Sequence, residues 1–330
     1  MLDRMLLYNI IYALAARGGR ESALFGDCFP PSQAAFARSL AGEAFPELWF
    51  ELPLDGEPWF DLHALTSRES LNADETFSSE QTGGNPDVFR WFASQERGMR
   101  QLALSWDVSR GEIEHPAVQL LLREDAAELT CGFLEAAGRP DAAPAYRAFH
   151  DSLPKGWFAC YTGVFPSRPG HNLRVECIPA DELQDVYAAD ISVLERHLRQ
   201  VGLTELGDTL LPRCQMLARL PFKIEFQFDV SPEGTADSTF SASLRFAPLP
   251  EYEKWDHFDP DGAAGELMGW LEEWGLTDER WRLLADTRFS QRISFGDESS
   301  VLYCIPTFVK LRWRDGNPVD AKVYLIAGAE

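Results

Sequence analysis

The sequence predicts an α+β protein in which ten antiparallel strands close into a barrel with helices on its outside. Two β-rich runs around a turn recur five times along the 330 residues. Helical patterns lie between most of these pairs, and several strands alternate apolar with polar side chains. Closure removes long exposed strand edges and leaves an interior wide enough for a ligand. An open sheet with one wet polar face is the alternative.

The five predicted hairpins each join two strands through a turn rich in Gly, Pro, Asp or Asn. Their strand pairs are 48–54 with 59–64, 102–108 with 117–122, 157–164 with 173–178, 222–230 with 239–246, and 301–314 with 321–326. In the fourth pair, Phe226 and Phe228 share one face while Glu225 and Gln227 share the other. We expect the apolar faces to meet the helices and the polar faces to line a lumen. Pro306 predicts a bulge in the ninth strand.

Helical spacing predicts a helix over 181–202 that stops at Gly202, and one over 262–275 that stops at Gly275. Each is followed by a second short helix, for which Thr277 is the expected N-cap in the later copy. A weaker copy covers 125–137 and restarts at Pro140. The Gly-Leu-Thr triplet recurs at 202–204 and 275–277. These recurrences predict a single barrel domain over 1–330, built from repeated αββα units.

Within that domain we expect N-terminal helices over 1–44, followed by the hairpins and helix pairs over 45–328. The apolar start Met1–Arg17 favours a folded helix over a signal peptide, because Asp3 cancels Arg4 and the required positive charge is missing. The polar stretch 66–86 predicts a long loop, either a lid over one barrel end or an unstructured insertion.

Composition excludes some partners. A formal charge of -22 argues against nucleic acid and against an anionic membrane surface. No apolar run reaches the length of a membrane-spanning helix. The six Cys lack C-x-x-C spacing, which indicates free thiols in a reducing cytoplasm. We therefore expect a cytoplasmic protein.

Two segments carry a resemblance to a known family. The last strand reads Ala321-Lys322-Val323-Tyr324-Leu325, and the first hairpin opens with Trp49-Phe50-Glu51-Leu52. With the repeated αββα layout over 44–328, the chain resembles the aromatic and peptide prenyltransferases of the ABBA, or PT-barrel, type. The resemblance implies transfer of a short isoprenoid from an allylic diphosphate to an aromatic or peptide acceptor. It implies no required cofactor, and leaves Mg²⁺ open as an accessory ion.

The resemblance also implies roles for side chains on the polar strand faces. The residues that it implies for binding the diphosphate are Arg174, Lys223, Arg245, Lys310, Arg312, Lys322 and Tyr324. The alternative is that these cations pair with the acids Glu176, Glu225 and Asp229 on the same faces. Glu51 is the candidate base or orienting carboxylate, or else a solvated strand residue. Asp61 and His63 could assist Glu51, while Trp49, Trp59 and Tyr161 are candidate walls for an allylic cation or ordinary core residues.

The chain departs from the family on the second and third hairpins. Val118–Leu122 contains no Lys or Arg, and Leu173–Glu176 offers only Arg174. A barrel with a degraded diphosphate site, binding a hydrophobic small molecule or peptide, is therefore the second hypothesis; a different enzyme on the same barrel is the third. Serine-hydrolase, Walker, dinucleotide and zinc-protease motifs are absent. Asp256, Asp259 and Asp261 resemble a calcium loop, but its twelfth position is Met268.

Overall fold

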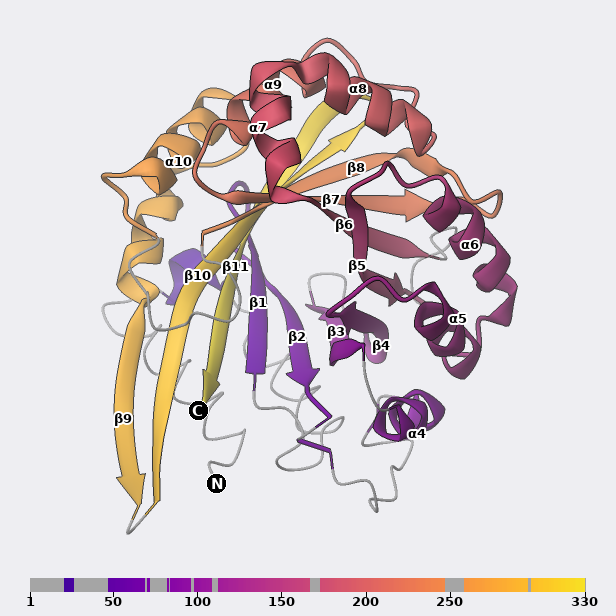
Figure 1. The fold of residues 1–330 in the computed structure, drawn as a ribbon. Helices are drawn as coiled ribbons and strands as arrows, with labels where there is room; N and C mark the ends of the chain where they lie inside the picture. Colours follow the sequence, from indigo (N-terminus) through magenta and orange to yellow (C-terminus); the bar gives the residue numbers. More distant parts are fainter. Residues whose placement is uncertain are drawn as a thin grey trace.

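The computed structural model describes residues 21–26, 47–68, 70–71, 82, 84–95, 98–108, 112–166, 173–246, 258–295 and 298–329 (Figure 1). The predicted helix over 1–17, most of the predicted loop 66–86, and Asp256 lie outside these residues.

Ten antiparallel strands form a closed barrel, as the sequence predicts. They are β1 Glu47–Pro53, β2 Asp61–Thr66, β3 Met99–Asp107, β4 Glu112–Leu122, β5 Trp157–Val164, β6 Arg174–Pro179, β7 Lys223–Val230, β8 Ala236–Arg245, β10 Glu298–Arg314 and β11 Asn317–Ala329. The strands follow one another in chain order from β1 to β8, then β10 and β11, and β11 pairs with β1 to close the ring.

A short additional strand was not predicted. β9 (Phe289–Phe295) pairs with the first half of β10, which is 17 residues long. Figure 1 shows this hairpin as a long arm at the lower left of the barrel. The pattern Phe289–Phe295 alternates only weakly in hydrophobicity, so periodicity gave no signal for it.

Helices cover the outside of the barrel in the order in which they occur along the chain (Figure 1). They are α2 Glu21–Leu24, α4 Pro86–Ser94, α5 Ala127–Ala136, η3 Pro140–Ala142, α6 Ala143–Asp151, α7 Asp181–Ala189, α8 Ile191–Gln200, α9 Leu210–Ala218, α10 Ala263–Glu273 and η4 Glu279–Thr287. The stops at Gly138, Gly202 and Gly275 are confirmed, since each has a positive φ.

Two helix predictions are wrong in detail. The single helix expected over 181–202 is two helices, because extended Asp190 interrupts it and accepts a hydrogen bond from the Ser192 N–H as the N-cap of α8. The predicted cap Thr277 is displaced by Asp278, whose carboxylate accepts from the Arg280 N–H at the start of η4.

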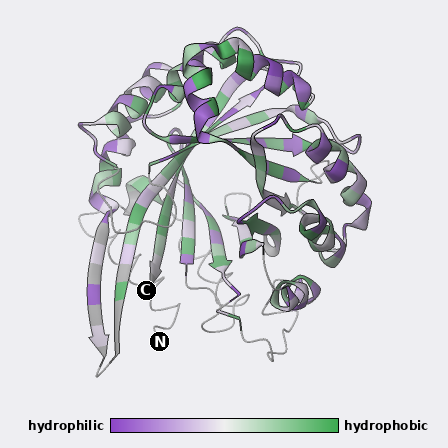
Figure 2. Cartoon of the chain, viewed as in Figure 1, coloured by the Kyte–Doolittle hydropathy of each residue, from purple (hydrophilic) through white to green (hydrophobic). Residues whose placement is uncertain are grey.

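The two faces of the barrel wall have opposite surroundings. The main hydrophobic core lies between the strands and the helices and includes Phe226, Phe228 and Trp313. Trp157 stacks on Phe226 there, with ring centroids 5.2 Å apart. A second, smaller apolar cluster that includes Trp49, Phe308 and Tyr324 lies on the inward face. Figure 2 shows the corresponding alternation of hydrophilic and hydrophobic positions along the strands.

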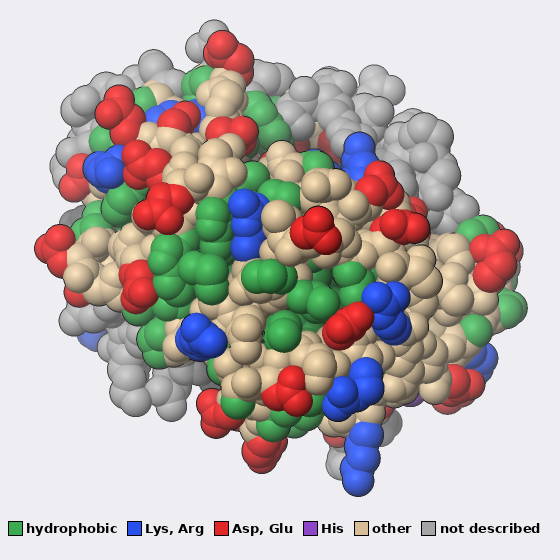
Figure 3. Space-filling model, turned by 90° about the horizontal axis from the view of Figure 1, so that it is seen from above, with side chains coloured by type: hydrophobic (Ala, Val, Ile, Leu, Met, Phe, Trp, Pro, Cys, Tyr) green, Lys and Arg blue, Asp and Glu red, His purple; other side chains and the backbone are tan. Residues whose placement is uncertain are grey.

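The outer helical face is polar and of mixed charge. Figure 3 shows acidic and basic side chains interspersed around apolar ones over this face. Val186 on α7 is one of its exposed apolar residues, with 39% of its surface accessible. No helix in the described part of the chain is long and apolar enough to cross a membrane.

Bulges decide which side chains enter the lumen. The expected irregularity at Pro306 is confirmed, because the β10–β11 register shifts between Pro306 and Phe308. A second shift on β5 lies between Ala159 and Tyr161. In strict alternation Tyr161 would share the outward face of Ala159, but the extra residue turns its ring inward.

The β10–β11 turn packs closely against another loop. Asp315 and Gly316 both have positive φ, the geometry of a two-residue hairpin turn. A Cβ atom on Gly316 would lie 2.5 Å from the carbonyl carbon of Leu206 and against the backbone of Gly207. Gly56, in the first hairpin turn, also has positive φ but has open space around it.

We expect Gly316→Ala to destabilise the protein more than Gly56→Ala. The Gly56→Ala change introduces only the backbone penalty of a left-handed alanine, about 1 kcal/mol. Gly316→Ala adds a clash with backbone that cannot rotate away. Urea unfolding of both variants measures the difference, and equal losses would show that the Leu206–Gly207 loop yields freely.

Candidate active site

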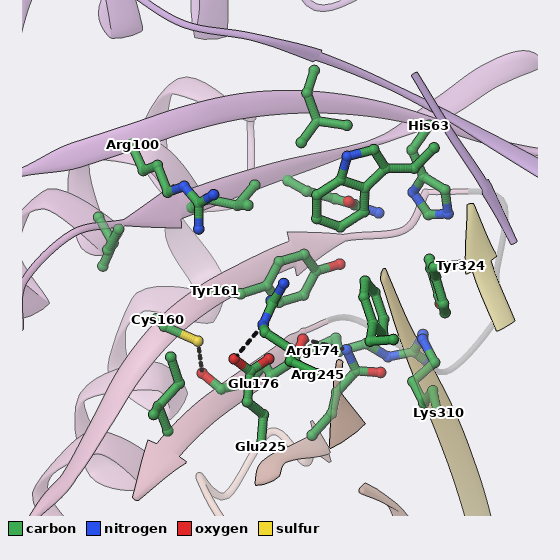
Figure 4. A pocket seen from close by; sticks show the side chains of 18 of the residues that line it. His63, Arg100, Cys160, Tyr161, Arg174, Glu176, Glu225, Arg245, Lys310 and Tyr324 are labelled. Atoms are coloured by element: carbon green, nitrogen blue, oxygen red, sulfur yellow. Dashed lines mark hydrogen bonds and ion pairs between the residues drawn. The ribbon is translucent and has the colours of Figure 1, made fainter. Parts of the chain in front are cut away.

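The lumen contains a large cavity of about 560 Å³. It extends from the middle of the barrel to the connection end, which we define as the end where β1, β3, β5 and β7 begin. Figure 4 shows ten labelled side chains around it, contributed by strands from β2 to β11. Of the candidates named from sequence, it is lined by Trp49, Glu51, His63, Tyr161, Arg174, Lys223, Arg245, Lys310 and Tyr324.

A smaller chamber of about 140 Å³ lies towards the opposite, turn end of the barrel. It is lined by the remaining candidates Trp59, Asp61, Arg312 and Lys322, together with Ser241 and Asp320. Glu51, Arg174, Gln227 and Lys310 line both spaces. All thirteen residues proposed from sequence therefore face one lumen. The four residues that line both spaces form the boundary between them.

Two lysines lie side by side at this boundary. Lys310 on β10 and Lys322 on β11 are direct cross-strand partners. Like charges directly opposite each other destabilise a sheet unless an anion lies between them. Glu51 is that anion: its Oε1 accepts a hydrogen bond from Lys322 Nζ at 2.6 Å. Burial lowers the pKa of Lys310, although the charge of Glu51 opposes this.

Glu51 is buried, with 8% of its surface exposed, so the expectation of a solvated strand residue is wrong. Its Oε2 lies 3.2 Å from His63 Nε2. Burial alone would raise the pKa of Glu51, but Lys310, Lys322 and His63 together hold it well below its ordinary value. Glu51 is therefore a carboxylate at neutral pH, hydrogen-bonded to Lys322 on the neighbouring strand β11.

Most other cations of the lumen already have carboxylate partners, as the alternative hypothesis expected. Arg174 Nε donates to Asp229 Oδ1 at 2.7 Å, and Arg245 Nε donates to Glu225 Oε1 at 2.5 Å. Arg312 pairs with Asp320 across the β10–β11 hairpin. Such pairs compensate the desolvation of each charge, and they leave less free positive charge for a ligand.

Lys223 lies at the connection end of the cavity. Its Nζ donates to Asp181 Oδ1 at 2.7 Å, and more than a third of its side chain is exposed. The alternation that placed Lys223 on the inward face was correct. Because Lys223 is the first residue of β7, it lies at the rim of the connection end. Lys322, in contrast, lines the chamber at the turn end.

Aromatic rings form the wall beside the lysine pair. The Tyr324 and Phe308 rings stack with centroids 4.0 Å apart, and Trp49 packs edge-on against both. Lys310 Nζ lies 4.8 Å from the Tyr324 ring centroid. On the other side, Lys322 Nζ lies 4.8 Å from the ring of Trp59. Stacked ring faces next to ammonium groups show that this wall accommodates a positive charge.

Glu176 on β6 is a different kind of lumen carboxylate. Within the described residues it has no cation within 4 Å, and its Oε2 accepts a hydrogen bond from Gln227 Nε2 at 3.1 Å. Burial and the charge of Glu225 raise the pKa of Glu176 to about 6. The sequence identified Glu176 only as a pairing partner for basic residues, and that pairing does not occur.

The polar or aromatic lining residues that were not predicted from the sequence include three beside the rim and the aromatic wall. Arg100 and Arg123 line the cavity at the connection end, and Phe308 completes the aromatic wall. Arg100 precedes the predicted start of β3 and lies within a register shift between Met99 and Gln101, which alternation cannot predict. Phe308, in contrast, lies two residues before Lys310 on the same strand and therefore on the same inward face, so alternation was sufficient to predict it.

The described residues contain no group of three His, Cys, Asp or Glu side chains arranged to hold a metal ion. Cys160 lines the cavity, but its thiol donates to the Glu176 carbonyl and burial raises its pKa well above the ordinary value. It is an unreactive thiol in this environment.

Comparison with solved structures finds proteins of similar fold. 5-Dimethylallyltryptophan synthase from Streptomyces coelicolor superposes with a TM-score of 0.57 and 13% sequence identity, covering 97% of this chain and 96% of that enzyme. The prenyltransferase PriB without ligands gives 0.55 at 15% identity, covering 98% and 96%. The chain has the fold of these prenyltransferases.

The ternary complex of PriB with L-tryptophan and dimethylallyl thiolodiphosphate also superposes, with a TM-score of 0.52 and 15% identity, covering 98% of this chain and 95% of that one. No family model and no curated protein matches the sequence. The ABBA-type barrel expected from the sequence is therefore confirmed as a fold, at an identity too low for sequence comparison to detect.

Glu51→Gln tests the electrostatics of the lysine pair. The variant removes the carboxylate that is hydrogen-bonded to Lys322 and leaves only Asp61, 4.0 Å from its Nζ, so we expect a loss of about 3 kcal/mol in unfolding free energy at pH 7. Because the folded-state pKa of Glu51 is depressed, its stabilisation is present above its ordinary pKa and is lost as pH falls through the folded value. The difference between wild type and variant should therefore shrink in acid.

Denaturant unfolding at several pH values measures this difference. Glu128→Gln is the matched control, since Glu128 pairs with Arg147 on the exposed helical surface, where little change is expected. A Glu51→Gln variant as stable as wild type at pH 7 would contradict the assigned role of Glu51 as the counterion.

Proposed function

We propose that the protein is a prenyltransferase that moves a short isoprenoid from an allylic diphosphate to an aromatic or peptide acceptor inside the barrel. The observation that carries the proposal is the buried pair Lys310 and Lys322, which lies between a small polar chamber and a large aromatic-walled cavity. A diphosphate needs concentrated positive charge as its C–O bond breaks, and this boundary supplies it.

The two chambers separate the two parts of the donor. The diphosphate fits the smaller chamber, where Lys322, Arg312 and Ser241 supply N–H and O–H donors. The allylic chain would then point past Lys310 towards Tyr324 and Phe308. Ring faces there stabilise the allylic cation that forms as the leaving group departs.

Lys322 can serve the donor without releasing Glu51. An ammonium group has three N–H donors, and only one is used in the hydrogen bond to Glu51 Oε1. Glu51 remains anionic beside the cation and can accept a hydrogen bond from an acceptor N–H or O–H. His63 supports the position of Glu51 through its contact with Oε2. Asp61, the cross-strand partner of Glu51 on β2, lies 4.0 Å from the same lysine, Lys322.

The larger cavity is suited to the acceptor. Its volume of about 560 Å³ and its ring-bearing residues Trp49, Tyr161 and Phe308 can enclose an aromatic group. The PriB complex supports this reading, since a protein of the same fold binds L-tryptophan together with an allylic thiolodiphosphate. We extend that chemistry, but not the identity of the acceptor, to this chain.

The remaining proposals follow from the sequence. We propose that residues 1–330 form one domain and act in the cytoplasm, without nucleic acid or membrane partners. We propose that basic side chains neutralise the charge of the diphosphate leaving group. The effect of Mg²⁺ is measured as a separate condition in the binding experiment below.

A second candidate function has a specific observation in its favour. Arg174, Arg245 and Arg312 are each neutralised by a carboxylate. Donor binding therefore depends on two lysines, fewer free cations than the resemblance implies. The alternative is a barrel that binds a hydrophobic small molecule or peptide without chemistry.

Donor binding and turnover separate the two functions. By calorimetry we expect dimethylallyl diphosphate to bind the wild type, and Lys310→Ala and Lys322→Ala each to weaken binding about 10- to 100-fold, since each removes a charge-assisted contact. Lys155→Ala, an exposed lysine on the α6–β5 turn, is the control and should bind as wild type does. The measurement is made with and without Mg²⁺, and with geranyl diphosphate to compare chain lengths.

No heat of binding with either diphosphate would exclude the prenyl donor and favour the binding protein. Binding that is lost in both lysine variants, but is followed by no prenylated product with any aromatic or peptide acceptor, would favour a carrier of isoprenoid diphosphates.

A further inference from the structure

The lumen contains one carboxylate that stands apart from the rest. In the part of the chain that the structure describes, Glu51, Glu225 and Asp229 each form an ion pair with a lysine or arginine. Glu176 lines the same large cavity without such a pair. A carboxylate held by a cation is a weak proton acceptor, whereas an unpaired one in an enclosed cavity is a stronger one.

Neighbouring strands fix the position of Glu176. It is the direct cross-strand partner of Tyr161 on β5 and of Gln227 on β7. Side chains in such pairs lie about 5 Å apart on the same face. The Gln227 amide donates to the Oε2 atom of Glu176, and this hydrogen bond orients the side chain. Glu176 thus stands beside the Tyr161 ring on the wall of the acceptor cavity (Figure 4).

Charged and titratable groups face Glu176 from every strand packed around it. They are Cys160 and Tyr161 on β5, Arg174 on β6 itself, Glu225 on β7, Arg245 on β8 and Lys310 on β10. Burial and Glu225 raise the pKa of Glu176, and the charges of Lys310 and Arg245 lower it, for a net value of about 6. Arg245 is shared with Glu225, whose Oε1 takes its Nε–H.

We propose that Glu176 is the proton acceptor of the transfer reaction, held in position by Gln227. The inference rests on the proposed prenyltransferase function. It gives that reaction a catalytic residue on β6, on the wall opposite Glu51 of β1. The positioning residue Gln227 acts only through Glu176.

The step balances as a substitution. The C1–O bond of the donor breaks and its electron pair leaves with the diphosphate. An electron pair of the aromatic ring forms the new bond to C1. The proton on the substituted ring atom then passes to Glu176, and the electrons of that bond restore the aromatic system. Glu176 later returns the proton to solvent, so no oxidant or further reactant is required.

This assignment divides the work of the two carboxylates. Glu51, surrounded by Lys310, Lys322 and His63, stays anionic and orients the acceptor. Glu176 is ionised in neutral solution, yet basic enough to take a proton from the cationic intermediate. Sequence position gives no indication of this division, because both residues are inward-facing strand glutamates.

Glu176→Gln tests the assignment in the full-length protein with dimethylallyl diphosphate and L-tryptophan, L-tyrosine or a tryptophan-containing peptide. We expect kcat to fall about 100-fold or more, with donor affinity unchanged. In wild type, kcat should fall below pH about 6 as Glu176 becomes protonated, and this acid limb should be absent from the variant. Glu176→Asp should retain part of the activity and should again show a fall of kcat in acid.

Gln227→Leu distinguishes positioning from a structural role. Loss of a hydrogen bond to the charged form raises a carboxyl pKa, so the acid limb should move to higher pH while kcat falls by a smaller factor. A lower kcat with an unmoved limb would show that Gln227 only supports the fold.

Thermal unfolding gives a readout that needs no substrate. A raised folded-state pKa stabilises the protein below the ordinary carboxyl pKa, and this stabilisation is lost as pH rises through about 6. The difference in Tm between Glu176→Gln and wild type should therefore shift in favour of the variant as the pH rises from 4.5 to 7.

The outcomes separate the two proposals. A wild type that prenylates none of the acceptors contradicts the proposed function itself. An active wild type with an equally active Glu176→Gln variant and an unchanged pH profile overturns only the assignment of Glu176. An unchanged pH dependence of Tm in the variant would also overturn it, because the group would not titrate where the reaction needs it.

Discussion

Closure of the barrel encloses the polar faces of ten strands, and every charge on those faces must then be compensated within the lumen. Arg174, Arg245 and Arg312 each meet this constraint through one carboxylate. Lys310 and Lys322 lie near Glu51, which accepts a hydrogen bond from Lys322, and near Asp61, whose Oδ2 lies 4.0 Å from Lys322 Nζ. The two ammonium groups lie where the small polar chamber meets the aromatic wall, and their N–H groups give the barrel a place for an anionic group.

The same constraint explains how one scaffold supports two carboxylates with different properties. Against the effect of burial, the lysine charges hold the pKa of Glu51 well below its ordinary value, whereas burial and Glu225 raise the pKa of Glu176 despite the opposing charges of Lys310 and Arg245. Both are strand residues with inward side chains, and the difference arises from the charged groups that the closed barrel brings near each of them. Register, fixed by hairpin turns such as Asp315-Gly316, therefore sets the electrostatics of the lumen.

Alternation and turn chemistry were sufficient to predict all ten barrel strands, the outward apolar faces and the inward position of the candidate residues on β7, β8, β10 and β11. They failed where the chain leaves its period. The bulge before Tyr161, the shift beside Arg100 and the break at Asp190 each insert or reorient one residue. Ion pairing could not be predicted either, because it depends on partners far apart in sequence, as Lys322 and Glu51 are, 271 residues apart. Family resemblance supplied roles that spacing alone did not.

The central claim is that the lysine pair on β10 and β11 receives a diphosphate. A crystal structure of the protein with dimethylallyl thiolodiphosphate, whose C–S bond resists cleavage, tests it most directly. We expect both phosphorus atoms in the smaller chamber, with the diphosphate in contact with Lys310 and Lys322, and the allylic carbons against Tyr324. An occupied lumen with the diphosphate at the connection end, or no analogue within the barrel at saturating concentration, would contradict it.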